Sequence, residues 1–198
     1  MKVDKSLPLE YSTEENSLKI LGFWIFIGAE IMLFATLFAS YFTLENRVGS
    51  GPSGAEIFEI TPVLIETLLL LTSSFTIGLA IHAMRLNRTK ATMTFFGITL
   101  LLGAAFLGVE IYEFVHYVHV GAGLQTSAFT AILLTTLGTH GLHVTFGLFW
   151  GLFILLQIKK RGLTPETANK SFIFSLYWHF LDVIWIFIFS FIYLKGMM

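Results

Sequence analysis

The stretch LGFWIFIGAEIMLFATLFASYF, residues 21–42, decides the fold class because Glu30 is its only charged residue. A hydrocarbon core of about 30 Å is crossed by roughly 20 helical residues. Four more runs of this kind follow, so the predicted spans are about 20–44, 62–84, 92–115, 128–157 and 172–194. The sequence therefore predicts an all-α, polytopic membrane protein, a bundle of five transmembrane helices.

Composition supports this class and excludes others. The chain is 55% hydrophobic and 13% charged, with 21 phenylalanines, which is too apolar for a soluble domain. It contains no cysteine, which excludes disulfides, thiolate zinc sites, iron–sulfur clusters and covalent c-type haem. The net charge of −1 and the lack of a long basic stretch give no sign of a nucleic-acid partner. We expect residues 1–19 to form a short, solvated cytoplasmic tail and residues 20–198 to form the transmembrane domain.

Positive charge predicts the orientation, because lysine and arginine are retained on the cytoplasmic side of a membrane. Ten of the 12 lysine and arginine residues lie in the amino-terminal tail, the second loop and the fourth loop: Lys2, Lys5, Lys19, Arg85, Arg88, Lys90, Lys159, Lys160, Arg161 and Lys170. Only Arg47 and Lys195 fall on the other side. We therefore expect a cytoplasmic amino terminus and an external carboxyl terminus.

The fourth loop carries signals for helix ends. Gly162 is placed to cap the fourth helix, and Thr164 with Pro165 forms an N-cap and first-turn pair for the fifth.

His82 lies close to the cytoplasmic end of the second span and can reach the interface. Eight other acidic or histidine side chains lie inside the predicted spans, and each must face the bundle interior, a partner or water. They are Glu30, Glu66, Glu110, Glu113, His140, His143, His179 and Asp182. Counting about 1.5 Å per residue from the helix ends sorts them into two layers. Glu66, Glu110 and Glu113 fall toward the outer face, and the other five fall from mid-membrane toward the inner half. Paired residues are spaced i, i+3, which predicts one polar face per helix.

The preferred interpretation of this set is a buried polar network that holds helices together. A di-iron site is the alternative, but the acids and histidines fall at different depths and the repeated Glu-x-x-His is missing. A haem needs histidines at matching height on facing helices, and two on one face cannot sandwich it. By depth, Glu30 is expected to pair with His140 or His143. Glu30 and Glu66 are the strongest candidates for a functional role, because neither has a polar partner on its own helix.

Small residues predict close packing of the fourth helix against its neighbours. Gly138, Gly141, Gly147 and Gly151 recur along it, and GLFWG is a small-xxx-small pair. Two other classes remain open. A transporter would show inverted repeats or broken helices, and no internal symmetry is evident. A membrane di-iron oxygenase would need clustered histidines, whereas the 6 histidines here are dispersed.

Several stretches together resemble subunit III of the haem–copper terminal oxidases. They are LGFWIFIGAEIMLFATLFASYF, LLLGAAFLGVEIYEF, LGTHGLHVTFG, KKRGLTPET and SLYWHFLDVIWIFIFSFIYLKG, in the order of the family. Five spans match the shorter form found in bacterial quinol oxidases and some bacterial cytochrome c oxidases. The stretches GPSGAEIFEITPVLIETLLLLTSS and KKRGLTPET are more similar to the quinol oxidase form, and the cytochrome c oxidase form is the alternative.

The resemblance implies an accessory subunit of a proton-translocating oxidase in a bacterial plasma membrane. It implies no redox centre and no catalytic or metal-binding residue in this chain, with haems and copper in the catalytic subunit I. Further implied partners are subunit II, a small subunit IV and phospholipids held in a cleft. The family's buried, carbodiimide-reactive glutamate corresponds to Glu30. Its signature polar positions correspond to His140, His143, His179 and Asp182.

Overall fold

The computed structural model describes residues 7–49 and 51–197. Within these ranges, five helices are long and apolar enough to cross a membrane. They are α1 (Glu14–Leu44), α3 (Ile60–Arg85), α4 (Thr89–His119), α5 (Ala128–Arg161) and α6 (Pro165–Ile188), the last continued by a π-helical segment, Phe189–Leu194. Two short elements accompany them, a 3-10 turn over Leu9–Tyr11 and the one-turn helix α2 (Gly54–Ile57). The prediction of an all-helical membrane protein with five spans is confirmed, and each predicted span lies inside one of these helices.

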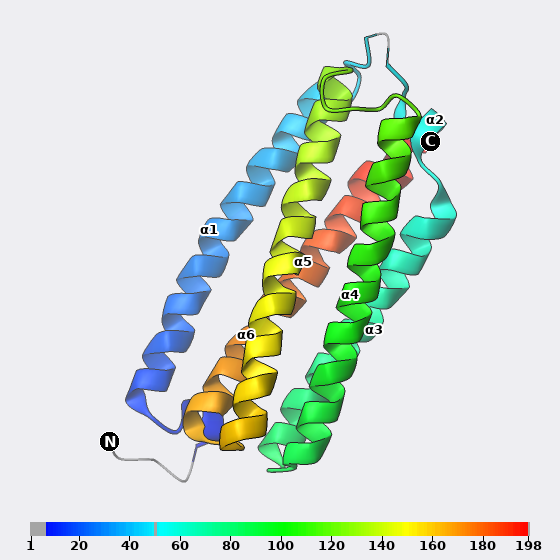
Figure 1. Cartoon of the computed structure of the whole chain (residues 1–198). Helices are drawn as coiled ribbons and strands as arrows, with labels where there is room; N and C mark the ends of the chain where they lie inside the picture. The colour runs from blue at the N-terminus through cyan, green and yellow to red at the C-terminus, as the bar shows by residue number, and fades with distance from the viewer. Residues whose placement is uncertain (1–6, 50, 198) are drawn as a thin grey trace.

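The helices run side by side in alternating direction (Figure 1). Helix α6 contacts α1, α3 and α5, whereas α4 packs against α3 and α5. Helix α1 lies at one edge of the bundle and packs against α5 and α6. The amino-terminal segment shares one end of the bundle with the α3–α4 and α5–α6 turns, and the carboxyl-terminal segment lies at the opposite end (Figure 1).

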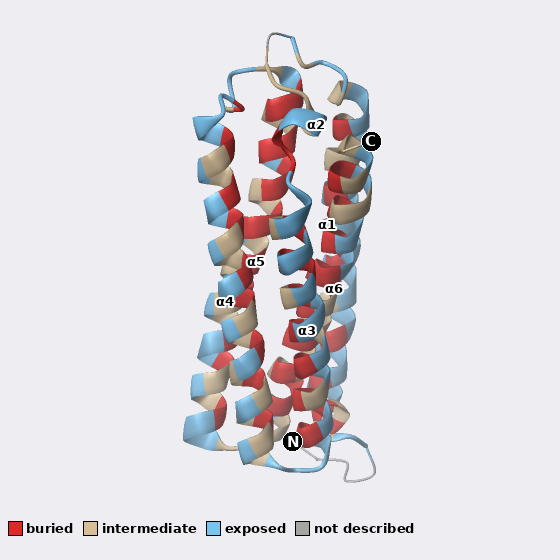
Figure 2. Ribbon diagram, turned by 90° about the vertical axis from the view of Figure 1, so that its right-hand side faces the viewer, coloured by how far each residue is buried: buried red, intermediate tan, exposed pale blue. Residues whose placement is uncertain are grey.

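The buried residues form stripes along the sides of the helices that face the bundle interior (Figure 2). Helix α6 is the most buried span and α1 the least. The outward surface is apolar, with Ile25, Met32, Leu101 and Leu142 all more than two-thirds exposed. A surface of this kind suits lipid rather than water.

Local sequence explains where the helices begin and end. Thr13 caps α1 by accepting a hydrogen bond from the Asn16 backbone N–H at 3.2 Å. The predicted cap of α6 is confirmed, because Thr164 accepts from the Thr167 backbone N–H and Pro165 occupies the first turn. Gly162 follows α5 with φ of 69°, a left-handed conformation that glycine adopts without steric cost.

The described part of the expected solvated tail is only partly exposed to solvent, because several of its polar residues are buried. Helix α1 begins at Glu14, and Glu10 is fully buried against the end of α6. The Glu10 Oε1 atom accepts hydrogen bonds from Arg85 Nε at 2.9 Å and Nη2 at 2.8 Å. Asn169 Nδ2 on α6 donates to the backbone oxygens of Glu10 at 3.0 Å and Asn16 at 3.1 Å. The amino-acid composition of the tail could not predict this burial, because the contacts are polar and join residues that are far apart in the sequence. Residues 1–6 of the predicted tail lie outside the described residues.

Candidate functional site: polar side chains within the bundle

Glu30 on α1 and His143 on α5 form an interhelical pair. Glu30 Oε2 lies 3.0 Å from His143 Nε2, and the side chains are 14% and 20% exposed. The structure thus brings Glu30 together with one of its two expected partners. The small remaining exposure is to the lipid-facing surface, beside a shallow hollow lined by Phe26, Phe146 and Tyr177.

The second nitrogen of His143 defines how protons are arranged in this pair. His143 Nδ1 lies 2.7 Å from the Thr139 carbonyl oxygen, which can only accept, so Nδ1 carries a proton. Nε2 is then either protonated beside an ionised Glu30 or unprotonated beside a neutral Glu30. In both arrangements one proton lies between the two side chains, and no further donor is needed to satisfy them.

His140 occupies a different environment, although it lies only three residues from His143. It is fully buried, and its ring lies 5.5 Å from Trp185, 5.9 Å from Phe106 and 6.4 Å from Phe34, measured between ring centroids. Neither ring nitrogen has a hydrogen-bond partner among the described residues. The two histidines share a side of the helix, since the Phe34 ring lies 6.4 Å from the His140 ring and 5.3 Å from the His143 ring, but they make different contacts. One histidine joins α5 to α1, and the other packs among aromatic rings.

Glu110 on α4 lies against α5. A Cβ atom added at Gly141 would fall 2.8 Å from Glu110 Oε2 and 2.9 Å from Oε1, so the glycine makes room for the carboxyl group. Glu110 is thus level with Gly141 and its neighbour His140, which corrects the predicted separation into two layers. The predicted third span ended at about residue 115, whereas α4 continues to His119. The shorter span placed Glu110 too close to the outer face.

A second acidic group lies toward the end of the bundle that carries the carboxyl terminus. Glu113 Oε2 accepts hydrogen bonds from Tyr193 Oη at 2.9 Å and Tyr117 Oη at 3.2 Å. Glu66 on α3 is fully buried with the acidic side chains of Glu113 and Glu110 as neighbours, and its carboxyl oxygens have no hydrogen-bond partner within the described parts of the chain. Sequence reasoning missed both tyrosines. The i, i+4 spacing from Glu113 to Tyr117 is the signal that could have indicated one of them.

The polar residues of α6 face α3. His179 Nδ1 lies 2.6 Å from Ser74 Oγ, whereas the buried carboxyl of Asp182 has no hydrogen-bond partner in the described chain. Two tryptophans of α6 also bond to α3, with Trp178 Nε1 donating to Ser73 Oγ at 2.9 Å and Trp185 Nε1 donating to Thr67 Oγ1 at 3.0 Å. No sequence pattern predicted these indole and hydroxyl bonds.

Glu30, His143, Glu113 and His179 therefore make separate local contacts, whereas the side chains of Glu66, Glu110, His140 and Asp182 have no hydrogen-bond partner among the described residues. Among the described residues, no group of three histidine, aspartate or glutamate side chains is arranged to hold a metal ion. The chemistry available to these groups is hydrogen bonding and proton sharing.

The glycines predicted for helix packing lie where neighbouring side chains approach α5. A Cβ at Gly147 would meet Trp178 at 3.0 Å and Tyr177 at 3.1 Å, and one at Gly151 would meet Leu100 at 2.6 Å and Phe174 at 2.8 Å. Gly138 is less constrained, because its nearest atom would be in the Phe114 ring at 3.6 Å. Three of the four glycines thus mark close contacts of α5 with α4 and α6.

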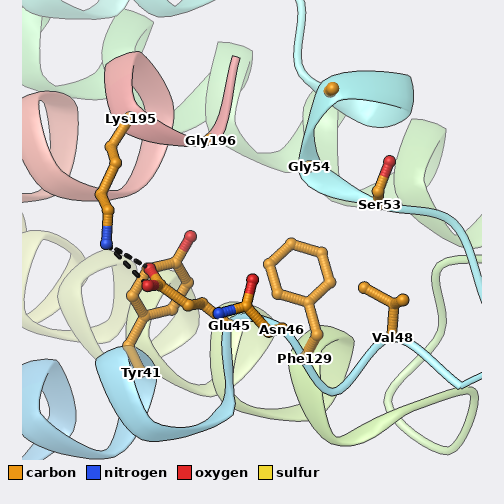
Figure 3. A pocket seen from close by; sticks show the side chains of 10 residues that line it. Tyr41, Glu45, Asn46, Val48, Ser53, Gly54, Phe129, Lys195 and Gly196 are labelled. Atoms are coloured by element: carbon orange, nitrogen blue, oxygen red, sulfur yellow. Dashed lines mark hydrogen bonds and ion pairs between the residues drawn. The ribbon is translucent and has the colours of Figure 1, made fainter. Parts of the chain in front are cut away.

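A pocket lined by both polar and apolar residues lies at the carboxyl-terminal end of the bundle, with a volume of about 320 Å³ (Figure 3). Lys195 reaches across it from the carboxyl-terminal segment, and its Nζ lies 2.6 and 2.8 Å from the two carboxyl oxygens of Glu45 at the end of α1. Lys195 Nζ also lies 5.0 Å from the centroid of the Phe42 ring. The ion pair offsets one of the two positive charges that the sequence places at this end.

Nearly the whole chain is similar to one family of known proteins. A model of the family described as cytochrome c oxidase subunit III matches residues 12–197. The quinol oxidase subunit 3 of Bacillus subtilis (strain 168) is 58% identical over 194 residues, which cover 98% of this chain and 95% of the relative. The cytochrome c oxidase subunit 3 of Bacillus sp. (strain PS3) is 50% identical over 190 residues, with 96% and 92% covered. The probable quinol oxidase subunit 3 of Staphylococcus saprophyticus is 47% identical, with 96% and 94% covered.

Proposed function

The chain belongs to the cytochrome c oxidase subunit III family, and we propose that it is the accessory subunit III of a bacterial haem–copper quinol oxidase. The observation that carries the choice of quinol is the 58% identity to relatives named quinol oxidase subunit 3, against 50% to a relative named cytochrome c oxidase subunit 3. In this role the complex oxidises quinol and reduces oxygen to water, while this chain supports the catalytic subunit.

The proposed partners are the catalytic subunit I, subunit II, a small subunit IV and membrane lipids. Haems and copper belong to subunit I in this proposal. The polar contacts within this chain support a structural role. They join α1 to α5 and α3 to α6 and do not converge on one reaction centre. Such bonds stabilise membrane bundles by on the order of 1 kcal/mol each.

Glu30 and His143 are proposed as the pair that fixes α1 to the remaining helices. Helix α1 is the least buried span, so each of its few interhelical polar contacts matters for its position. The hollow beside His143, with a volume of about 220 Å³ and several aromatic side chains along it, supports the proposal that lipid packs here. The remaining buried polar residues are proposed to be structural.

The proposed orientation places the amino terminus in the cytoplasm and residues 1–19 on that side. The arrangement of the turns supports it, because the Arg88-containing α3–α4 turn and the α5–α6 turn that follows Lys159, Lys160 and Arg161 lie at the same end of the bundle as the amino-terminal segment (Figure 1).

The proposal is tested by purifying the native complex from its membrane in mild detergent and identifying the chains that accompany this one. We expect large haem-containing partners and rapid oxygen consumption with a quinol. The second candidate, subunit III of a cytochrome c oxidase, is supported by the 50% identical relative. Turnover with reduced cytochrome c and none with quinol would select it. A preparation with stoichiometric metal or haem bound to this chain alone would contradict the accessory role.

A further inference from the structure

A surface between α3 and α6 faces the membrane along the middle of the bundle. We call it the α3–α6 seam, and it is formed by Leu71, Ser74 and Gly78 on α3 and by His179, Val183 and Ile186 on α6. Its apolar side chains are open to the membrane, with Leu71 45% and Val183 54% exposed. Leu64 and Leu68 continue the exposed stripe on α3, which runs for about 20 Å from Leu64 to Gly78 at 1.5 Å of rise per residue.

His179 presents a polar atom at the surface of this seam. Its side chain is partly exposed, and its Nδ1 atom lies 2.6 Å from Ser74 Oγ. The other ring nitrogen, Nε2, has no hydrogen-bond partner in the described chain and, unlike the ring nitrogens of His140, is not enclosed by it. An imidazole nitrogen donates when it carries a proton and accepts when it does not. Both tautomers of His179 therefore leave Nε2 in need of a partner.

Asp182 adds a second polar group directly behind the seam. It is 6% exposed, and neither carboxyl oxygen has a hydrogen-bond partner among the described residues. Asp182 lies beside Ser74, whose single hydroxyl hydrogen can be given to Asp182 or to His179 but not to both. The three side chains therefore cannot all be satisfied within this chain, and the accessible atom among them is Nε2 of His179.

Depth in the membrane limits what can satisfy this nitrogen. His179 lies about 20 Å from the start of α6, and Ser74 lies about 20 Å from the start of α3, so both are near the middle of their spans. Water and lipid headgroups are excluded from the hydrocarbon core at this depth, and an acyl chain has no group that can form a hydrogen bond. Lipid alone would therefore leave His179 unpaired.

We propose that the α3–α6 seam docks a transmembrane helix of another subunit of the complex. That helix carries, at mid-membrane, a hydroxyl, amide or imidazole side chain that hydrogen-bonds to His179 Nε2. This inference rests on the proposed function, which supplies partner subunits in the same membrane.

The shape of the seam favours a helix over a small molecule. Ser74 and Gly78 form a small-xxx-small pair on α3, and a Cβ added at Gly78 would meet nothing within 4 Å, so the glycine faces outward. Pairs of this kind let the backbone of a second helix approach closely. The exposed stripe runs for about 20 Å along α3, which matches a packed helix, whereas a small ligand needs a concave site that covers most of its surface.

The first test maps the neighbour of the seam in the whole complex. Val183 is replaced by the photoreactive residue benzoylphenylalanine, which Val183 tolerates because it is more than half exposed. Native membranes are illuminated, the complex is purified, and cross-linked peptides are identified by mass spectrometry. We expect one adduct that joins this chain to a different subunit, at a peptide within a transmembrane span of that subunit that contains a hydrogen-bonding side chain.

A matched pair of substitutions tests the hydrogen bond. In His179→Gln the side-chain amide occupies the place of Nε2 and keeps the outward contact, whereas in His179→Asn it occupies the place of Nδ1 and keeps only the contact with Ser74. The measurement is the rate at which the haem-containing partner leaves the captured chain after dilution in detergent. We expect His179→Asn to lose the partner about fivefold faster than His179→Gln.

Two glycine variants test the close approach. Gly78 and Gly108 are both exposed, and a Cβ at either position meets nothing within 4 Å, so leucine fits both positions within the isolated chain. Gly78→Leu places its side chain on the seam and should speed loss of the partner by about tenfold. Gly108→Leu places the same side chain on α4, away from the seam, and should leave the rate unchanged.

Three results would overturn the proposal: adducts of Val183 with lipid alone or with a second copy of this chain, equal rates for His179→Gln and His179→Asn, or equal rates for the two glycine variants. The cross-link decides the matter even where a variant fails to assemble. If a haem-containing partner co-purifies and the seam cross-links only to lipid, this inference fails alone. If no haem-containing chain accompanies the protein, the proposed function beneath it fails.

Discussion

Glu30 and His143 show how a single polar pair can fix a helix that is otherwise held by apolar contacts. The pair lies close to the lipid-facing surface, where an unpaired carboxyl or imidazole would meet hydrocarbon instead of water. Its strength comes from direct hydrogen bonding at 3.0 Å and from the backbone bond that orients His143. The same geometry determines which substitutions the site can accept.

Glu30→Gln should leave the initial oxidase turnover within about twofold of normal, because the amide N–H can donate to His143 Nε2 and preserve a bond of on the order of 1 kcal/mol. The pair then loses its shared proton, and we expect a shorter working life during continuous turnover. The measurement is oxygen consumption over time by the purified complex. Glu30→Leu serves as the comparison, since it leaves His143 without its partner and should weaken retention of α1. Immediate loss of turnover in Glu30→Gln would instead place Glu30 directly in proton delivery.

Sequence reasoning reached this residue pair because depth along two antiparallel helices limits the possible partners of Glu30. It placed Glu110 too close to the outer face, because the predicted span ended at about residue 115 whereas α4 continues to His119. It also could not find Tyr193, whose hydroxyl bonds to Glu113 from a distant helix. A tyrosine that donates its hydroxyl to a buried acid carries no charge. Nothing in the sequence therefore distinguishes it from the other buried aromatic residues.

At the scale of the element, α5 is positioned by the glycines along its length. Gly151→Ala should destabilise the contact with α4 and α6 by about 1–3 kcal/mol, because its Cβ would lie 2.6 Å from Leu100 and 2.8 Å from Phe174. The readout is the denaturation midpoint of the complex in detergent. Gly97→Ala on α4 is the matched control, since a Cβ there meets nothing within 4 Å. Equal effects of the two substitutions would mean that helix propensity, and not close approach, governs both sites.

The amino-terminal segment gives a second prediction for an element. Arg85→Met should destabilise the packing of Leu9–Tyr11 more than Glu10→Gln does, by about 2 kcal/mol, because it leaves a buried carboxylate without its cation. Protection of this segment from hydrogen exchange provides the measurement. The half-exposed guanidinium of Arg85 returns to water when Glu10 is neutralised, so Glu10→Gln should be the milder change. The reverse order would show that the pair does not hold the segment in place.

Helix boundaries were predictable where short-range chemistry sets them and not elsewhere. Gly162, Thr164 and Pro165 end one helix and start the next through their own conformational preferences. The early start of α1 was missed, because hydropathy rises only after Lys19 whereas the helix begins at the Thr13 cap. The first turn of α1 carries charged residues, so a search for apolar runs does not detect it.

For the whole molecule, the number of spans was predictable and their arrangement was not. Apolar length alone gives five helices, because crossing hydrocarbon requires it. Neighbours could not be assigned, since lipid is as apolar as the bundle interior and the hydrophobic pattern does not distinguish the two. The central place of α6 and the peripheral place of α1 depend instead on shape, on glycines and on scattered polar contacts.

The two ends of the bundle differ in charge, and this difference predicts the orientation of the whole molecule. The chain contains no cysteine, so single cysteines can report each side. Gln125→Cys, exposed in the α4–α5 loop, should react with a membrane-impermeant maleimide on intact cells. Lys90→Cys, exposed at the start of α4, should react only after the cells are permeabilised. Ten of the 12 lysine and arginine residues support this assignment, and Lys195 on the other side is already paired with Glu45. Labelling of Lys90→Cys on intact cells would reverse the orientation, and with it the side on which the Glu10 and Arg85 contact lies.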